Sequence, residues 1–145
     1  MQFVRIFYHL AISFWIGGAA IFTLLLTPII FKAMGRDAAG QIVGILFPGY
    51  FRWGLVCGGC ALFCRLLLKE RSLLVVVIIC AMLALTLFQA QYLEPRVAEL
   101  KKRIPSFETT PKEDPLRREF GRLHGISAVC NLAVLGGGTV LIILF

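Results

Sequence analysis

Long apolar runs dominate this chain of 145 residues. The run from Ile6 to Phe31 contains no Asp, Glu, Lys or Arg, and similar runs extend over Ser72–Leu93 and Leu123–Phe145. A helix needs roughly 20 consecutive, mainly apolar residues to cross the hydrocarbon core of a bilayer, so each run is long enough. Hydrophobic residues make up 59% of the chain, against roughly 45–50% in soluble domains. The sequence therefore predicts an integral membrane protein.

A fourth run, from Phe47 to Leu68, is less uniform because Arg52 and Arg65 interrupt it. Long basic side chains near the ends of a span can reach the membrane interface, so we predict a membrane-spanning helix here as well. Residues 38–47 form a short amphipathic stretch before this run. Because proline disrupts helix interiors, we expect Pro48 to end that stretch and to let the span begin at a new angle.

The predicted fold is all-α, a four-helix transmembrane bundle with both termini on the same side, in a single integral membrane domain over residues 1–145. The predicted helices span residues 3–32, 47–69, 72–103 and 118–145. The third helix is expected to extend beyond the membrane, and a polar loop is predicted over residues 104–117. The turn before the third helix, Lys69–Arg71, is so short that the second and third helices should be antiparallel neighbours.

Basic residues are unevenly distributed between the two ends of such a bundle. Of the 15 Lys and Arg residues, only Arg5, Arg65, Lys69 and Arg71 fall at the end that carries both termini, the termini end. The others fall at the opposite end, the loop end. Cytoplasmic loops carry an excess of Lys and Arg, so we predict a cytoplasmic loop end and external termini, in a plasma or inner membrane. The net charge of +7 is thus a topology signal and needs no nucleic-acid partner.

Polar residues also gather where the last span begins, in the stretch FGRLHGISAVCNL. His124, Ser127 and Asn131 stand at i, i+3 and i+7 and so share one helix face. A polar stripe in a membrane helix should face protein or water rather than lipid. On the third helix, Gln91 and Glu94 stand three residues apart at the same membrane level. The spacing therefore predicts a polar cluster between these two helices near the loop end.

Three arginines are expected at this level as well: Arg52, Arg96 and Arg122. An unpaired carboxylate at such depth costs on the order of several kcal/mol, so Glu94 should pair with one of them. Two interpretations stay open, a polar pocket that opens at the loop end or a structural ion pair with interhelical hydrogen bonds that fixes the bundle. The pocket would be lined by Arg52, Gln91, Tyr92, Glu94, Arg96, Arg122, His124, Ser127 and Asn131.

Four stretches, HLAISFWIGG, LFPGYF, QYLEPRV and FGRLHGISAVCNL in this order, resemble the transmembrane protein 205 type of four-helix membrane protein. That family is grouped under a domain of unknown function. The resemblance touches all four predicted helices and implies an integral membrane four-helix fold without an assigned chemistry. At the loop end it rests on Tyr92, Glu94, Pro95, Arg96, His124, Gly125, Ser127 and Asn131. These residues coincide with the polar cluster that helical spacing indicates.

The first helix shows a weaker resemblance to two other groups. His9, followed by Trp15 and the Gly17–Gly18 pair, is similar to the first helix of copper-resistance protein D and of HemJ-like haem-binding proteins. This resemblance implies haem binding at His9. However, His9 and His124 should lie at opposite ends of a hydrocarbon core about 30 Å thick, so one haem iron cannot take both as axial ligands.

Cysteines form a further stripe on the second helix, because Cys57, Cys60 and Cys64 stand at i, i+3 and i+7. Thiolate ligands suit soft ions such as Cu(I). Buried free cysteine is also a common small apolar residue. We therefore predict no cofactor and keep haem at His9 or copper at the cysteines as the alternative.

No enzymatic activity is predicted, because the sequence has no phosphate-binding loop, no paired carboxylates within a span and no nucleophile, histidine and acid arrangement. The first functional hypothesis is a membrane protein that binds or transports a small solute or ion, with Glu94 and His124 as gating or proton-linked groups. An accessory or scaffold subunit is the structural alternative. Expected partners are the lipid bilayer and either further copies of the chain or a larger membrane complex.

Overall fold

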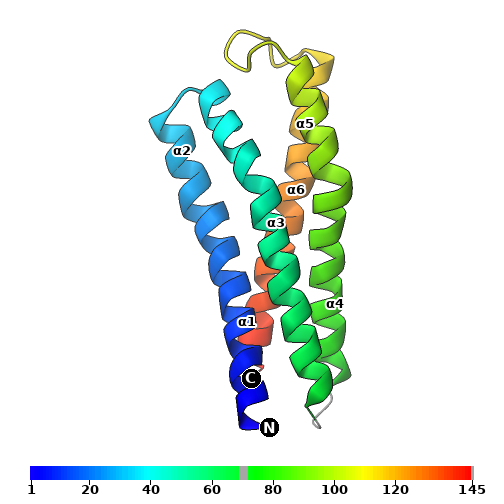
Figure 1. Ribbon diagram of the computed structural model, residues 1–145. Helices are drawn as coiled ribbons and strands as arrows, with labels where there is room; N and C mark the ends of the chain where they lie inside the picture. The colour runs from blue at the N-terminus through cyan, green and yellow to red at the C-terminus, as the bar shows by residue number, and fades with distance from the viewer. Residues whose placement is uncertain (69–71, 145) are drawn as a thin grey trace.

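The computed structural model describes Met1–Leu68 and Ser72–Leu144. All regular structure in these residues is helical, and the helices join into four rods, each long and apolar enough to cross a membrane (Figure 1). The rods span Gln2–Ala33, Arg36–Leu67, Leu73–Arg103 and Pro115–Ile143. The predicted all-α fold with four membrane-spanning helices is confirmed, and the protein is an integral membrane protein.

Two of the rods are built from several elements. The first consists of α1 (Gln2–Ala20), the π-helical turn η1 (Ile21–Leu26) and α2 (Thr27–Ala33), and the third of α4 (Leu73–Phe88), the π-helical turn η2 (Gln89–Leu93) and α5 (Glu94–Arg103). The second and fourth rods are the single helices α3 (Arg36–Leu67) and α6 (Pro115–Ile143). The helix ends predicted at residues 69 and 145, and the predicted turn Lys69–Arg71, lie outside the described residues.

The second rod differs most from its prediction. Helix α3 begins at Arg36 instead of residue 47 and continues through Pro48, so the predicted break at this proline is wrong. A proline inside a helix loses a backbone hydrogen bond, but membrane helices tolerate it where neighbouring groups compensate. Here the rings of Phe47 and Phe51 stack across the proline turn with centroids 5.5 Å apart. This packing supports the turn, and the amphipathic stretch 38–47 becomes part of α3.

Arg65 also differs from its prediction, because its side chain is only 2% exposed and does not extend to the interface. It belongs to the buried face of α3, which continues from Gly54 through Gly58 and Ala61 at helical spacing. The side chain is thereby directed into the bundle. Arg52, at the other end of the predicted span, is exposed as expected.

Helix α6 starts at Pro115, earlier than the predicted residue 118, because Asp114 caps it. The backbone N–H groups of Leu116 and Arg117 donate to Asp114 Oδ1 at 2.9 and 3.3 Å. An aspartate at the N-cap followed by proline at the first helical position is a favoured helix start. The connection between α5 and α6 is correspondingly shorter than the predicted loop.

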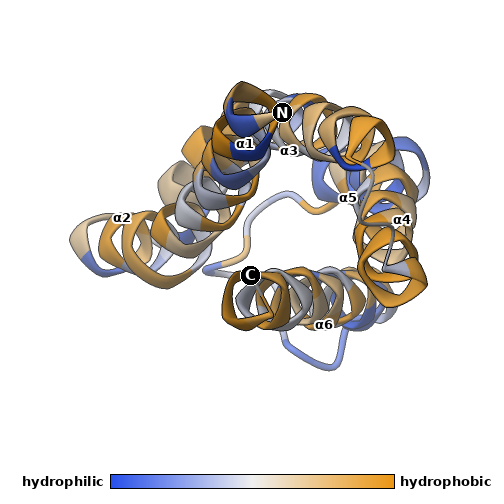
Figure 2. Ribbon diagram, turned by 90° about the horizontal axis from the view of Figure 1, so that it is seen from below, coloured by the Kyte–Doolittle hydropathy of each residue, from blue (hydrophilic) through white to orange (hydrophobic). Residues whose placement is uncertain are grey.

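The half of the bundle at the termini end holds the hydrophobic core. Helices α1, α3, α4 and α6 surround it, and α1 begins where α6 ends (Figures 1 and 2). Trp15 of α1 lies against glycines of α3. A Cβ atom added at Gly54 would meet Trp15 Nε1 at 3.0 Å, and one added at Gly58 would meet the Trp15 ring at 2.6 Å. Small residues therefore allow α1 and α3 to approach closely, as is common in membrane helices.

The half of the bundle at the loop end is more open. Both π-helical turns lie immediately before proline-containing helix starts, at Pro28 and Pro95, where a backbone N–H is missing. At the end of η1 the Phe22 carbonyl accepts hydrogen bonds from both the Thr27 backbone N–H and, at 2.8 Å, the Thr27 hydroxyl. Beyond η1, helix α2 diverges from α6 (Figures 1 and 2). This divergence leaves the loop end of the bundle less filled than the termini end.

Candidate functional site

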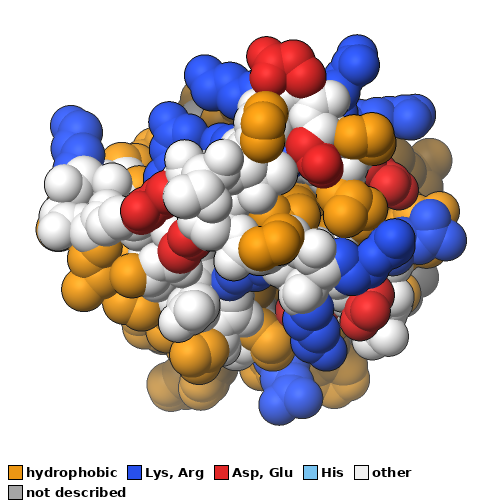
Figure 3. Space-filling view, turned by 90° about the horizontal axis from the view of Figure 1, so that it is seen from above, with side chains coloured by type: hydrophobic (Ala, Val, Ile, Leu, Met, Phe, Trp, Pro, Cys, Tyr) orange, Lys and Arg blue, Asp and Glu red, His pale blue; other side chains and the backbone are white. Residues whose placement is uncertain are grey.

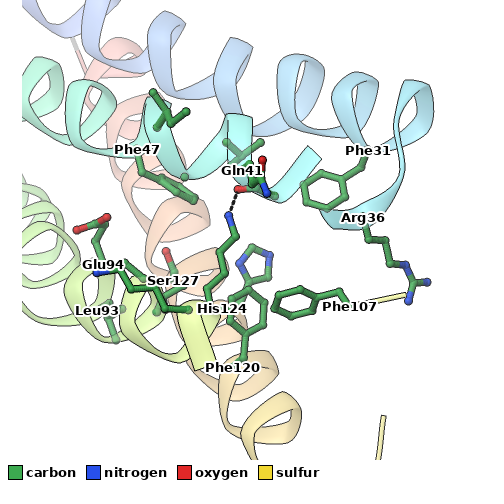
Figure 4. A pocket seen from close by; sticks show the side chains of 18 of the residues that line it. Phe31, Arg36, Gln41, Phe47, Leu93, Glu94, Phe107, Phe120, His124 and Ser127 are labelled. Carbon is green, nitrogen blue, oxygen red and sulfur yellow. Dashed lines mark hydrogen bonds between the residues drawn. The ribbon is translucent and has the colours of Figure 1, made fainter. Parts of the chain in front are cut away.

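A cleft of about 680 Å³ lies at the loop end, between α3, α5 and α6, and α2 contributes one side chain. Its size is typical of small-molecule sites, which range from about 300 to 1,000 Å³. Phenylalanine side chains form much of its wall: Phe31, Phe47, Phe51, Phe107 and Phe120. Figure 4 shows four of these rings, Phe31, Phe47, Phe107 and Phe120, together with Glu94, His124 and Ser127.

The segment around Ser106 and Phe107 covers the cleft at the loop end, and we call it the roof. Asp37, in the first turn of α3, holds the roof by hydrogen bonds. Its carboxylate accepts hydrogen bonds from Ser106 Oγ and from the Phe107 backbone N–H, both at 2.6 Å. Both donors lie in the segment between α5 and α6, so these hydrogen bonds join that segment to α3, which is distant in the sequence. They place the Phe107 ring over the cleft.

A row of aromatic rings extends from the roof along the side of α6 that lines the cleft. The Phe107 and Phe120 centroids are 4.6 Å apart, and Phe120 lies parallel to the His124 imidazole at 6.0 Å with an interplanar angle of 5°. The guanidinium of Arg117 lies over the Phe107 ring, 5.9 Å from its centroid. The roof and the α6 wall are therefore one packed aromatic unit.

Lys101 of α5 places an ammonium group inside the cleft, against the backbone of α3. Its Nζ donates to the Gly40 carbonyl (dashed in Figure 4). A Cβ atom added at Gly44 would lie 3.3 Å from Lys101 Nζ, a tight contact, whereas one added at Gly40 would lie 3.6 Å from it, an ordinary contact. Sequence reasoning did not single out Lys101, although the pair Gly40 and Gly44 at i, i+4 was a readable sign of close approach.

Two side-chain hydrogen bonds close the floor of the cleft. Ser127 Oγ donates to Gln89 Oε1 at 2.8 Å, and the Tyr50 hydroxyl donates to Asn131 Oδ1 at 3.1 Å. Gln89 is only 1% exposed. The spacing argument selected Gln91 instead, because it assumed a regular α-helix up to Glu94. The π-helical turn η2 widens the helix between them, and Gln89 faces the interior while Gln91 is exposed.

The remaining predicted residues are distributed between the cleft and the outer surface. Glu94, His124 and Ser127 line the cleft, whereas Asn131 does not line it and is buried against Tyr50. The other members of the predicted pocket are exposed and do not line it: Arg52, Gln91, Tyr92, Arg96 and Arg122.

The predicted pairing of Glu94 with an arginine is wrong within the part of the chain that the structure describes. Arg96 lies over the Tyr92 ring instead, 4.0 Å from its centroid. Residues two apart in a helix do not face each other, so Arg96 cannot turn toward the Glu94 carboxylate in the cleft. The one ion pair found among the described residues joins Lys102 and Glu99 on the exposed side of α5.

Residues 10–106 match a family model described as a domain of unknown function (DUF4149). The chain belongs to this family. The matched range includes the α3 and α5 walls of the cleft, and it stops before α6. A relative described as an uncharacterized protein from Aquifex aeolicus (strain VF5) is 31% identical over 136 residues, which cover 92% of each chain. No solved structure matches significantly.

Among the described residues of this DUF4149 protein, no group of three or more His, Cys, Asp or Glu side chains could hold a metal ion. His9 lies near the start of α1 and contacts the Tyr8 ring edge-on at 5.3 Å. Of the cysteine stripe, Cys57 and Cys64 are buried in the core and Cys60 is exposed on the outer face of α3. The stripe therefore divides between two environments.

Replacing Asp37 with alanine is expected to detach the roof of the cleft in this DUF4149 protein. The Phe107 N–H then loses its acceptor, and we expect amide hydrogen exchange over residues 104–110 to become severalfold faster, because exchange reports local opening. Mass spectrometry of the exchanged protein measures this. Glu113→Ala, which removes an exposed carboxylate from the same segment, is the control and should leave exchange unchanged. Equal exchange in both variants would show that Asp37 does not hold the roof.

Proposed function

We propose that this protein binds a small, largely apolar solute in the cleft at its loop end. The observation that carries the proposal is the cleft itself, with a volume of about 680 Å³ and a wall of phenylalanine rings interrupted by a few polar groups. Apolar cavities with a small number of convergent polar groups are the usual form of a ligand site. Glu94 and His124 are the ionisable groups that line it together with the basic residues of α3 and α5.

Binding is favoured over passage of the solute through the bundle. The Ser127–Gln89 and Tyr50–Asn131 hydrogen bonds close the floor, and the hydrophobic core fills the bundle between this floor and the termini end. A solute that enters the cleft therefore meets a closed floor. Transport would require these hydrogen bonds to open and is a secondary form of the proposal.

Binding is also favoured over catalysis. The Ser127 hydroxyl donates to Gln89 and not to His124, so the arrangement lacks the nucleophile–base hydrogen bond of a hydrolase. We further infer that the loop end faces the cytoplasm, because basic side chains surround that end of the molecule (Figure 3) and the positive-inside rule favours this orientation. The resemblance to the transmembrane protein 205 type belongs to this proposal, since its motifs supply Glu94 and His124.

Filling the cleft tests the proposal. Ala98 of α5 lines the cleft, and Ala98→Trp is expected to occupy the space and abolish binding. The measurement is native mass spectrometry of protein extracted in mild detergent, in which the unmodified protein should retain about one small molecule per chain. Ala84→Trp makes the same chemical change at an exposed position of α4 and should retain the molecule.

Two results would contradict the proposal. One is that the unmodified protein retains no small molecule after exposure to a total lipid and metabolite extract. The other is that Ala98→Trp and Ala84→Trp retain the same molecule equally well, which would place it outside the cleft. Circular dichroism of both variants checks that the helices remain folded.

A further inference from the structure

We propose that the solute is a single-chain anionic amphiphile of the fatty-acid carboxylate class, with its head group at Lys101 and its chain along the phenylalanine wall. This inference rests on the proposed function and specifies its ligand. It combines three independent properties of the cleft: the sign of the charge at its loop end, the apolar character of its walls, and its position relative to the membrane.

The charges that line the cleft favour an anion at its loop end. Arg36 and Lys101 contribute cationic groups at this end, whereas Lys102 pairs with Glu99 on the exposed side of α5. Glu94 is the one acidic residue among the lining side chains.

Lys101 directs its ammonium inward and donates to the neutral Gly40 carbonyl. The Asp37 carboxylate is close enough to attract this ammonium, but its hydrogen bonds come from Ser106 and Phe107. An ammonium has three donors, and hydrogen bonds to a charged partner are roughly twice as strong as those to a neutral one. A carboxylate beside Lys101 would therefore be a better partner than the carbonyl.

The walls favour a long apolar body. Phe47 and Phe51 present their stacked rings from α3, and Phe31 faces them from α2 (Figure 4). Such rings contribute mainly apolar contact area and leave few hydrogen bonds to satisfy. The cleft volume is at the middle of the range for drug-sized ligands, which suits a ligand with a single chain.

Access from the bilayer is expected on the α2 side of the cleft. Phe31 lines the cleft from α2 and is still 41% exposed, so this wall is in contact with the surroundings of the protein. We therefore place the entry of a membrane-dissolved chain on this side, beside Phe31. An amphiphile can thus reach the site without leaving the bilayer.

The depth of the cleft in the membrane suits a molecule with a charged head group at one end and an apolar chain at the other. Helix α3 has 32 residues, about 48 Å at 1.5 Å per residue, against a hydrocarbon core of about 30 Å. The loop end of the bundle therefore extends into the head-group layer. Lys101 lies two turns beyond Leu93, which borders the cleft floor, so a head group at Lys101 would lie near the interface and its chain would point toward the hydrocarbon.

Glu94 fixes the orientation of the ligand. It precedes Lys101 by seven residues on the same helix face, about 10 Å deeper at 1.5 Å per residue. A carboxylate at that depth would be repelled by Glu94, whereas the uncharged end of the chain would not. The Glu94 carboxylate below and the Lys101 ammonium above therefore select one direction of binding.

Photo-crosslinking tests the inference. The full chain is reconstituted in phosphatidylcholine vesicles at pH 8 and irradiated with a palmitate analogue that carries a diazirine near its chain end. Crosslinks are expected on the α3 and α5 walls of the cleft, and oleate should compete at least about tenfold more strongly than the uncharged oleyl alcohol, because a charge-assisted hydrogen bond is lost. Lys101→Gln should weaken the competition by oleate by about tenfold, and Lys101→Arg should largely preserve it.

Matched variants separate the head-group site from general electrostatic attraction. Lys32→Gln removes an exposed charge at the same end of the molecule, outside the cleft lining, and should leave oleate binding unchanged. Glu94→Gln should keep or tighten it. If Lys101→Gln does not fold, as judged by circular dichroism, Lys101→Met, which keeps the apolar stem and removes the charge, serves in its place and should weaken oleate binding by about tenfold.

The outcomes distinguish this inference from the proposed function. If oleyl alcohol competes as well as oleate, or if the Lys101→Gln variant binds oleate as tightly as the unmodified protein, the anionic head-group site is wrong while binding of an apolar solute in the cleft stands. If the probe crosslinks nowhere in the cleft and Ala98→Trp has no effect on labelling, both the inference and the proposed function are wrong.

Discussion

Replacing Gly58 with leucine is expected to separate α1 from α3 and to lower the free energy of unfolding by about 3 kcal/mol or more. Even a Cβ atom at this position would lie 2.6 Å from the Trp15 ring and 2.6 Å from Leu83 Cδ2. Trp15 is 3% exposed and held on several sides, so it has no free space to move into. The larger side chain therefore forces the helix backbones apart.

The neighbouring glycine provides the control. A Cβ atom added at Gly59 would meet nothing within 4 Å, and the position is exposed on the outer face of α3. Gly59→Leu should therefore leave stability unchanged or raise it slightly, since leucine is the better helix former. Unfolding in mixed micelles with increasing denaturing detergent, followed by circular dichroism, measures the difference. Equal stability of the two variants would show that close approach at Gly58 does not support the bundle.

Replacing Ser127 with alanine is expected to cost about 1–2 kcal/mol of stability, because it leaves the buried Gln89 amide without its donor. A buried polar group that loses its partner costs about 1–3 kcal/mol, while interhelical hydrogen bonds in membranes contribute on average about 0.6 kcal/mol. Gln89→Leu should cost less, because the remaining Ser127 hydroxyl can donate to a carbonyl of its own helix. The double variant should recover part of the loss.

A double-mutant cycle in the same unfolding assay gives the coupling between the two residues. Thr139→Ala is the control on the same helix, since the exposed Thr139 hydroxyl donates to the Leu135 carbonyl within α6. This variant should be close to neutral. Additive effects of Ser127→Ala and Gln89→Leu would mean that their 2.8 Å contact does not contribute to the stability of the native bundle.

The number and type of helices could be predicted because they depend on a local property, the length of each apolar run. The chain between Leu73 and Arg103 has a mean hydropathy of 2.7 in its most apolar window, and such a segment has few alternatives to a membrane helix. The helical spacing also identified Glu94, His124 and Ser127 as neighbours, and all three line the cleft.

Other parts of the site depend on contacts that no local pattern contains. Pro48 stays within α3 because side chains around it pack together, and Gln89 faces the interior because η2 changes the angular register of the helix. The role of Asp37 arises only when the segment between α5 and α6 folds back over α3. In the sequence, Lys101 is one of several basic residues at the end of a span. Its position in the cleft depends on the contact with Gly40, which joins two helices that are distant in the sequence.

The two π-helical turns divide two of the rods into a core part and an extension toward the loop end. In the first rod, α1 packs in the hydrophobic core and α2 is the extension; in the third rod, α4 packs in the core and α5 is the extension. Wide turns next to proline are places where helices bend. Membrane thickness acts on the ends of α2 and α5 through hydrophobic mismatch. We therefore expect the width of the cleft to depend on the thickness of the bilayer in which the protein is embedded.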